Sequence, residues 1–147
     1  MTSLKYAAAL ALFSAPAFAD GHAPSGNGDI AAGEAEFNRQ CVSCHVITNA
    51  SGDVLAGRSG RTGPNLFNIP GATIGTVAGF RYGDSIVAAG AQGGVWTEAD
   101  FVDYVQDPTG YLRAVLNDQR ARGRMSYRVR DPQQAVDIYA YIASLSE

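Results

Sequence analysis

Five consecutive residues, Cys41-Val42-Ser43-Cys44-His45, constrain this chain more than any other feature of its sequence. They form the CxxCH pattern, which is typical of covalent c-type haem attachment. On one helical turn the two thiols project so that each can add to a vinyl group, and the following imidazole then lies under the iron. We therefore expect Cys41 and Cys44 to hold one haem c, with His45 as the proximal iron ligand.

Three other interpretations of the cysteine pair are weaker. A zinc site needs further ligands, but the chain has only two cysteines, and its second histidine, His22, lies in a segment rich in Gly, Pro, Ser and Asn. A thioredoxin-like redox pair needs a βαβ setting, which the sequence lacks. A disulfide between residues three apart closes a very small loop and so adds little stability, although an exported protein would permit one.

A haem protein that only transfers electrons needs a second axial ligand, usually Met or His. Besides Met1, the only methionine is Met125, which lies in the polar, glycine-bearing segment 123–128. A lone methionine can also fill a gap in a hydrophobic core. The polarity of the segment favours a loop around a cofactor, so we predict that Met125 is the second ligand.

Residues 1–19 have the pattern of an export signal. A cation at Lys5 precedes a short apolar stretch, and Ala17-Phe18-Ala19 supplies small residues for cleavage before Asp20. The stretch is shorter than the roughly 20 residues of a membrane anchor. We expect a removed signal peptide at 1–19, a flexible tail at 20–28 and one domain at 29–147, in the periplasm.

Arginine supplies all the positive charge after the predicted cleavage site, because Lys5 is the only lysine. The mature chain then has 10 Arg against 14 Asp and Glu, a formal net charge of −4. An acidic chain is a poor candidate for nucleic-acid binding. Six of the arginines fall within residues 113–130, on both sides of Met125.

Apolar residues recur at spacings of three and four in five segments, which predicts an all-α, single-domain fold. The first helix leads into the cysteine motif and has Gly33 and Phe37 on its apolar face. The last helix has the clearest start, with Asp131 as cap, Pro132 at the first position and Gln134 at the third.

Three short helices are predicted between these two. Asp84 is expected to cap the first, which Gly90 ends, and Thr97 to cap the second, which Pro108 stops. Asp107 and Pro108 start the third. Residues 49–63 are rich in Gly, Ser and Arg and predict a long surface loop, with irregular chain as far as residue 82 and no alternating pattern that indicates a strand.

Several motifs besides CxxCH occur in a fixed order along the chain. They are Gly33 and Phe37, Thr62-Gly63-Pro64-Asn65-Leu66, Phe80-Arg81-Tyr82, Trp96, Tyr104 with Pro108, Met125, and Tyr141. Over roughly residues 29–145 the chain thereby resembles the class I cytochromes c, particularly the bacterial cytochrome c-two group, which are relatives of mitochondrial cytochrome c.

This resemblance implies roles for residues around the haem. The Pro64 carbonyl should accept a hydrogen bond from His45, Tyr82 and Trp96 should hold a haem propionate, and Tyr104 should lie beside the Met125 sulfur. Ordinary core packing is the alternative for the aromatic residues.

The resemblance also implies that Gly33, Phe37 and Tyr141 form the crossing of the first and last helices. Two features of this chain depart from the family. Ala72 stands at a position where family members often have an arginine that contacts a haem propionate. The mature chain also lacks the lysines that usually surround the haem edge in the family.

By the same resemblance, the function is that of a soluble, monomeric electron carrier with one haem. Its donor would be a cytochrome bc-type complex, and its acceptor a terminal oxidase or a photosynthetic reaction centre. The alternative is a haem enzyme such as a peroxidase, which needs an open iron position and distal polar groups. The arginines near the ligand loop, Arg122, Arg124 and Arg128 among them, are expected to steer the protein toward acidic partners.

Overall fold

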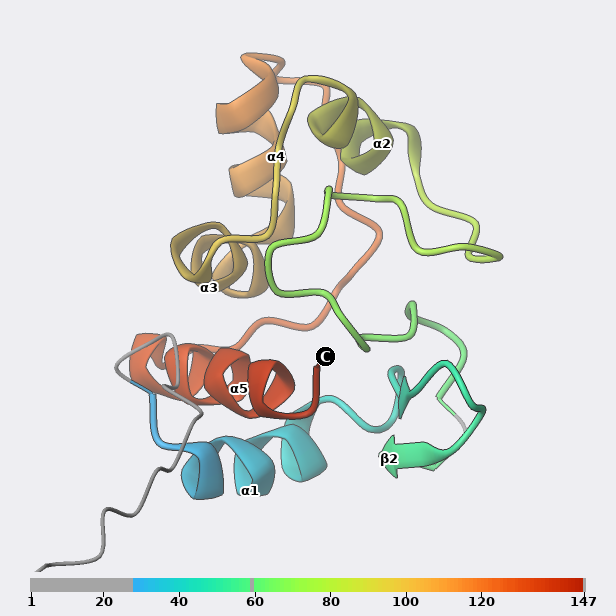
Figure 1. Ribbon diagram of the computed structural model, residues 1–147. Helices are drawn as coiled ribbons and strands as arrows, with labels where there is room; N and C mark the ends of the chain where they lie inside the picture. The colour runs from blue at the N-terminus through green and yellow to red at the C-terminus, as the bar shows by residue number, and fades with distance from the viewer. Residues whose placement is uncertain (1–27, 59, 147) are drawn as a thin grey trace, which may run out of the picture.

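Two helices from opposite ends of the chain cross to form the frame of the fold. The computed structural model describes residues 28–58 and 60–146, so the predicted signal peptide and all but the last residue of the predicted tail lie outside the described residues. Helix α1 (Ile30–Gln40) packs against helix α5 (Pro132–Ser144), and Figure 1 shows them side by side.

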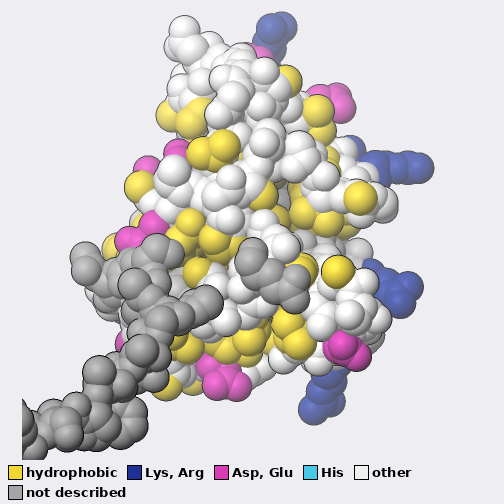
Figure 2. Space-filling model, viewed as in Figure 1, with side chains coloured by type: hydrophobic (Ala, Val, Ile, Leu, Met, Phe, Trp, Pro, Cys, Tyr) yellow, Lys and Arg dark blue, Asp and Glu magenta, His cyan; other side chains and the backbone are white. Residues whose placement is uncertain are grey.

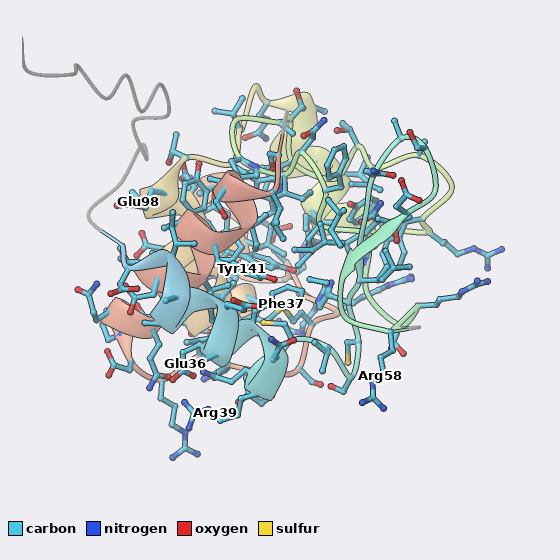
Figure 3. All side chains as sticks on the ribbon, turned by 60° about the horizontal axis from the view of Figure 1, so that its bottom comes forward. Glu36, Phe37, Arg39, Arg58, Glu98 and Tyr141 are labelled. Atoms are coloured by element: carbon cyan, nitrogen blue, oxygen red, sulfur yellow. The ribbon has the colours of Figure 1, made fainter. Side chains whose placement is uncertain are left out.

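The contact between α1 and α5 depends on a glycine. A Cβ on Gly33 would lie 2.0 Å from the Asp137 carbonyl oxygen, so only glycine permits this approach. Phe37 is fully buried, and its ring centroid lies 5.6 Å from that of Tyr141, as Figure 3 shows between the two helices. The predicted crossing of Gly33, Phe37 and Tyr141 is confirmed.

Side chains fix where these two helices begin. Asp29 accepts a hydrogen bond from the Ala32 amide and Asp131 accepts one from the Gln133 amide, each at the N-terminus of its helix. The predicted cap at Asp131 is therefore confirmed. Gln134 accepts a hydrogen bond at 3.0 Å from the Gln40 side chain, which joins α5 to the end of α1.

The other three helices stack on α5 in the order α3 (Glu98–Gln106), α4 (Pro108–Leu116) and α2 (Asp84–Ala91) (Figure 1). Thr97 caps α3 as predicted, through the amide of Asp100. Helix α4 starts at Asp107 and Pro108 as predicted, and the Asp107 side chain caps it through the amide of Gly110. The predicted cap at Asp84 is wrong. Gly83 is the N-cap of α2 and makes no side-chain cap hydrogen bond, while the Asp84 carboxylate lies in the first turn.

Gly90 does not end α2, which runs to Ala91. A Cβ on Gly90 would lie 1.9 Å from the Ile74 carbonyl oxygen, so this glycine serves a close approach between helix and loop rather than a helix end. The position of a glycine in a sequence does not show whether it ends a helix or allows another segment to approach closely.

A short antiparallel hairpin lies within the region predicted as loop. Strand β1 (Ile47–Thr48) pairs with β2 (Val54–Ala56), and Asn49 and Asp53 bond to each other across the turn. Strands of two and three residues are too short for an alternating pattern to reveal them. The fold remains all-α in class, and no helix within residues 28–58 and 60–146 is long and apolar enough to cross a membrane.

Candidate haem site

A cavity of about 470 Å³ lies between the helices and the long connecting segments. Such a volume falls within the roughly 300–1,000 Å³ of small-molecule and cofactor sites. Its apolar wall includes Leu66, Ile69, Ile86, Phe101, Val105 and Ile138. Cys41, Cys44, His45 and Met125 line the same cavity, although Cys41 and Met125 are 84 positions apart in the sequence.

A turn that continues from the end of α1 places the cysteine motif at this cavity. The Cys41 amide bonds the Phe37 carbonyl at 2.8 Å, and the His45 amide bonds the Cys41 carbonyl at 2.9 Å. The helical path is thus extended through the motif, as the thiol spacing requires. Burial, and secondarily the neighbouring Cys44, raises the pKa of the Cys41 thiol to about 12, so that thiol is protonated at neutral pH.

The His45 ring is oriented by the chain segment that follows the hairpin. Its Nδ1 lies 2.9 Å from the Pro64 carbonyl oxygen, to which it donates, and this leaves Nε2 available as a ligand atom. Burial lowers the pKa of His45, and the Pro64 hydrogen bond opposes this shift. Since neutral imidazole is the form that binds metals, the pocket favours the ligating state.

Gly63 allows the chain to pass close to this imidazole. A Cβ on Gly63 would lie 2.5 Å from His45 Nδ1, and the Gly63 amide bonds the Cys44 carbonyl at 2.8 Å. Any larger residue would push Pro64 or the imidazole ring away, which gives a physical reason for the glycine beside Pro64.

Met125 reaches the cavity from the irregular segment between α4 and α5. Asn117 ends α4 in the left-handed conformation, and the Gly123 amide donates to the Thr109 hydroxyl at 3.1 Å. Further along, the Val129 amide bonds the Val105 carbonyl at 2.9 Å. Met125 is partly buried against the core between these attachment points.

These residues fit a covalently bound haem. The walls are apolar, the two thiols are adjacent, and an imidazole nitrogen and a thioether sulfur are available as iron ligands. This donor set is that of cytochromes c. Within the described residues, no group of three or more His, Cys, Asp or Glu side chains could hold a metal ion.

No family model matches the chain. It is 57% identical to cytochrome c2 of Rhodovulum adriaticum over 119 residues, which cover 81% of this chain and 94% of that protein. It is 43% identical to cytochrome c2 of Cereibacter sphaeroides over 145 residues, which cover 97% and 95% of the two chains. The crystal structure of cytochrome c2 from Rhodobacter sphaeroides matches with a TM-score of 0.78 at 44% identity and covers 80% of this chain and 96% of that one.

The chain belongs to the cytochrome c2 family. It is therefore an electron carrier rather than an enzyme, its cofactor is one covalently bound haem c, and its fold is that of the class I cytochromes c.

Three aromatic residues predicted for the haem pocket line the cavity of this cytochrome. Tyr82, Trp96 and Tyr104 are all in the wall, and the Trp96 and Tyr104 ring centroids lie 5.0 Å apart. Burial raises the pKa of Tyr82 and raises that of Tyr104 to about 12, so both phenols are neutral donors at physiological pH. The Trp96 amide bonds the carbonyl of Ala72.

Three arginines also line the cavity: Arg81, Arg122 and Arg124. Arg124 passes over Gly83, where a Cβ would lie 3.0 Å from its Nε. Sequence reasoning did not assign a role to Arg81, although it lies between Phe80 and Tyr82 in a motif that carried the resemblance. These three arginines therefore share the cavity wall with Tyr82, Trp96 and Tyr104. Position 72, where an arginine was expected from the resemblance, is an alanine.

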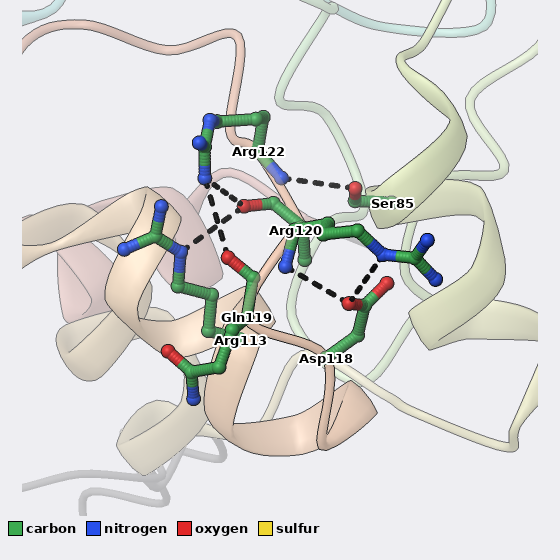
Figure 4. Close-up of polar contacts among 7 residues, drawn as sticks. Ser85, Arg113, Asp118, Gln119, Arg120 and Arg122 are labelled. Atoms are coloured by element: carbon green, nitrogen blue, oxygen red, sulfur yellow. Dashed lines mark hydrogen bonds and ion pairs between the residues drawn. The ribbon is translucent and has the colours of Figure 1, made fainter.

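Hydrogen bonds and an ion pair hold three arginines of segment 113–130 in two places. Arg113 and Arg122 both donate to the Ala121 carbonyl in the turn after α4, and the Arg122 amide bonds the Ser85 hydroxyl (Figure 4). Arg128 instead pairs with Asp107 at 2.9 Å. In Figure 2 several Arg side chains project from the right of the molecule, and carboxylates lie on both its left and its right.

Proposed function

We propose that this cytochrome is a periplasmic shuttle that carries single electrons from a membrane-bound cytochrome bc-type complex to a terminal oxidase or a photosynthetic reaction centre. Cys41 and Cys44 would attach the haem, and His45 and Met125 would supply the two protein ligands of its iron. The observation that carries the proposal is that both thiols, the imidazole and the thioether line one apolar cavity.

Each of these side chains has a separate task. The bound haem supplies a one-electron redox couple. The Pro64 carbonyl orients the His45 imidazole and increases its basicity. The Met125 thioether favours the ferrous state and raises the reduction potential. Tyr82 and Trp96 hold a propionate, and Tyr104 lies beside the Met125 sulfur. With His45 and Met125 both as ligands, the iron would have no position left for a substrate.

Replacement of both cysteines tests the attachment site. In the Cys41→Ser and Cys44→Ser double variant no thioether can form, so the haem should be extractable under denaturing conditions or absent. Haem staining of a denaturing gel and the absorption spectrum measure this. The matched control is Ser43→Ala within the same motif, which should keep covalent haem. Covalent haem in the double variant would refute the site.

Arginine side chains at and near the cavity favour docking to an acidic partner protein. Arg122 and Arg124 are in the cavity wall, and Arg128 lies in the same connecting segment, at an exposed ion pair with Asp107. A net acidic protein can therefore present a basic surface beside its cofactor and be steered toward acidic docking sites. Because electron-transfer complexes are small and transient, these charges should act mainly on the association rate.

A charge-matched comparison tests this docking surface. Changing Arg122, Arg124 and Arg128 to Gln should slow second-order electron transfer to a membrane acceptor by about tenfold at low salt and flatten its dependence on ionic strength. The control changes Arg58, Arg61 and Arg120 to Gln, which removes the same charge outside the cavity wall. Equal slowing in both triple variants would show that net charge alone steers docking.

The proposal that the protein is exported depends on the sequence pattern of residues 1–19. The mature protein should begin at or near Asp20, after Ala17-Phe18-Ala19. N-terminal sequencing of holoprotein recovered from the periplasmic fraction tests this. An intact Met1 on the functional protein would contradict it.

A further inference from the structure

A single hydroxyl joins the segment that carries the proposed methionine ligand to the end of helix α1. Tyr127, two positions after that methionine, donates its phenolic hydrogen to Gln40 Oε1 at 3.0 Å. Within the part of the chain that the structure describes, this is the hydrogen bond by which residues 124–127 reach another segment. The next attachments along the chain are the amide hydrogen bond of Gly123 on one side and the ion pair of Arg128 on the other.

The Gln40 amide is held in one orientation by two further partners. Its Nε2 donates to Glu36 Oε2 at 2.5 Å and to Gln134 Oε1 at 3.0 Å. The hydrogen bond from Arg39, above all, lowers the pKa of Glu36, so this carboxylate is ionised at neutral pH and acts as an acceptor. Gln40 therefore turns its nitrogen toward Glu36, which leaves its oxygen for Tyr127. Helices α1 and α5 together fix the acceptor of the tyrosine hydroxyl in place.

This hydrogen bond lies in the wall between the haem cavity and a polar groove on the surface. Gln40 and Tyr127 line both spaces, and the groove is also lined by Arg39, Arg128 and Arg130. The Tyr127 side chain is 48% exposed, so limited core packing holds it in place. Segments with few buried contacts open most readily, and the hydroxyl bond therefore contributes a large share of what keeps this one closed.

We propose that the Tyr127–Gln40 hydrogen bond is a latch that keeps the Met125 segment closed over the haem cavity. When the latch opens, the segment moves away from α1, and a small ligand enters from the groove. The lone pair of that ligand replaces the lone pair of the Met125 sulfur, and no electron or proton is transferred. Tyr127 and Gln40 are thus positioning residues for the ligand. The inference rests on the proposed function through the assignment of Met125 as iron ligand.

Azide binding to the ferric holoprotein, followed by absorption, measures how often the segment opens. Tyr127→Phe keeps the ring and removes the hydroxyl, so azide should bind about fivefold more tightly, as expected for the loss of one hydrogen bond of ordinary strength. Uncharged imidazole should show the same fold-change at low and at high salt, because the latch joins two uncharged groups. Gln40→Leu should give a similar increase. The double variant should bind azide no more tightly than either single variant, because both remove the same bond.

Tyr111→Phe is the matched control. It also removes one tyrosine hydroxyl, which donates to Asp100 Oδ1 at 3.0 Å, but Tyr111 lines neither the cavity nor the groove. Its azide binding should match the wild type, which separates loss of the latch from a general loss of stability.

Met125→Ala distinguishes the latch from the ligand assignment, since it should bind azide more tightly than any latch variant. If Met125→Ala does so while Tyr127→Phe binds azide as the wild type does, the latch is refuted and the proposed function stands. If Met125→Ala and the wild type bind azide equally, Met125 is not the ligand, and both the assignment and the latch are wrong.

Discussion

The crossing of α1 and α5 and the segment that carries Met125 are built in opposite ways. The crossing is a close contact of two helices around Gly33 and Phe37, with no space for additional atoms. Residues 117–131 have no regular structure and are held at separate points, such as the hydrogen bonds of Gly123 and Val129. We infer that the crossing determines whether the chain folds, and that the segment determines the properties of the haem iron.

The strongest test of this contrast lies in the crossing. Gly33→Ala places a Cβ 2.0 Å from the Asp137 carbonyl oxygen, so the helices must separate. The free energy of unfolding should fall by about 3 kcal/mol, at the upper end for overpacking, or the variant should fail to fold. Chemical denaturation followed by circular dichroism measures this.

The control for Gly33→Ala is on the exposed face of the same helix. Ala31→Val adds atoms that point into solvent and should cost only a few tenths of a kcal/mol through helix propensity. If Gly33→Ala folds with the stability of Ala31→Val, then the crossing is not the rigid frame described.

The second test removes the proposed iron ligand from the irregular segment. Met125→Ala should lower the midpoint potential by roughly 0.1 V or more, since axial ligands strongly set haem potentials. It should also let azide or carbon monoxide bind. Stability should fall by about 2 kcal/mol, less than for Gly33→Ala, because the side chain is only partly buried.

Voltammetry and ligand titration measure the Met125 effect, and Ser126→Ala is its control because Ser126 also lines the cavity. The Ser126→Ala variant should have the wild-type midpoint potential and should not bind azide or carbon monoxide. An unchanged potential in Met125→Ala would direct the search to another ligand.

The smallest effect is expected where the two regions meet. Asp131→Ala removes the cap of α5, and stability should fall by about 1 kcal/mol. The midpoint potential should stay within error of the wild type, because the cap is not part of the cavity wall. Asp131→Asn retains a capping oxygen and should recover most of the loss. A shifted potential in Asp131→Ala would mean that the helix start and the ligand segment are coupled.

Prediction from the sequence succeeded where the signal is local. The caps at Thr97 and Asp131, and the helix start at Asp107, were found because a side chain beside the helix start satisfies a free backbone amide within three residues. It failed at Asp84 and Gly90, since the carboxylate of Asp84 lies inside the first turn and Gly90 is fixed by a contact with Ile74 from a distant segment.

The sequence alone determined the chemistry of this protein: two thiols and an imidazole at haem-attachment spacing, and Met125 as the only methionine beyond residue 1. Counting and spacing suffice there, because covalent attachment is set by neighbouring residues. Only the tertiary structure decided which side chains surround the cavity, that Arg81, Arg122 and Arg124 share its wall, and that Tyr111 bonds Asp100 beside Trp96. Those contacts join segments far apart along the chain, and their geometry comes from packing, which no local pattern encodes.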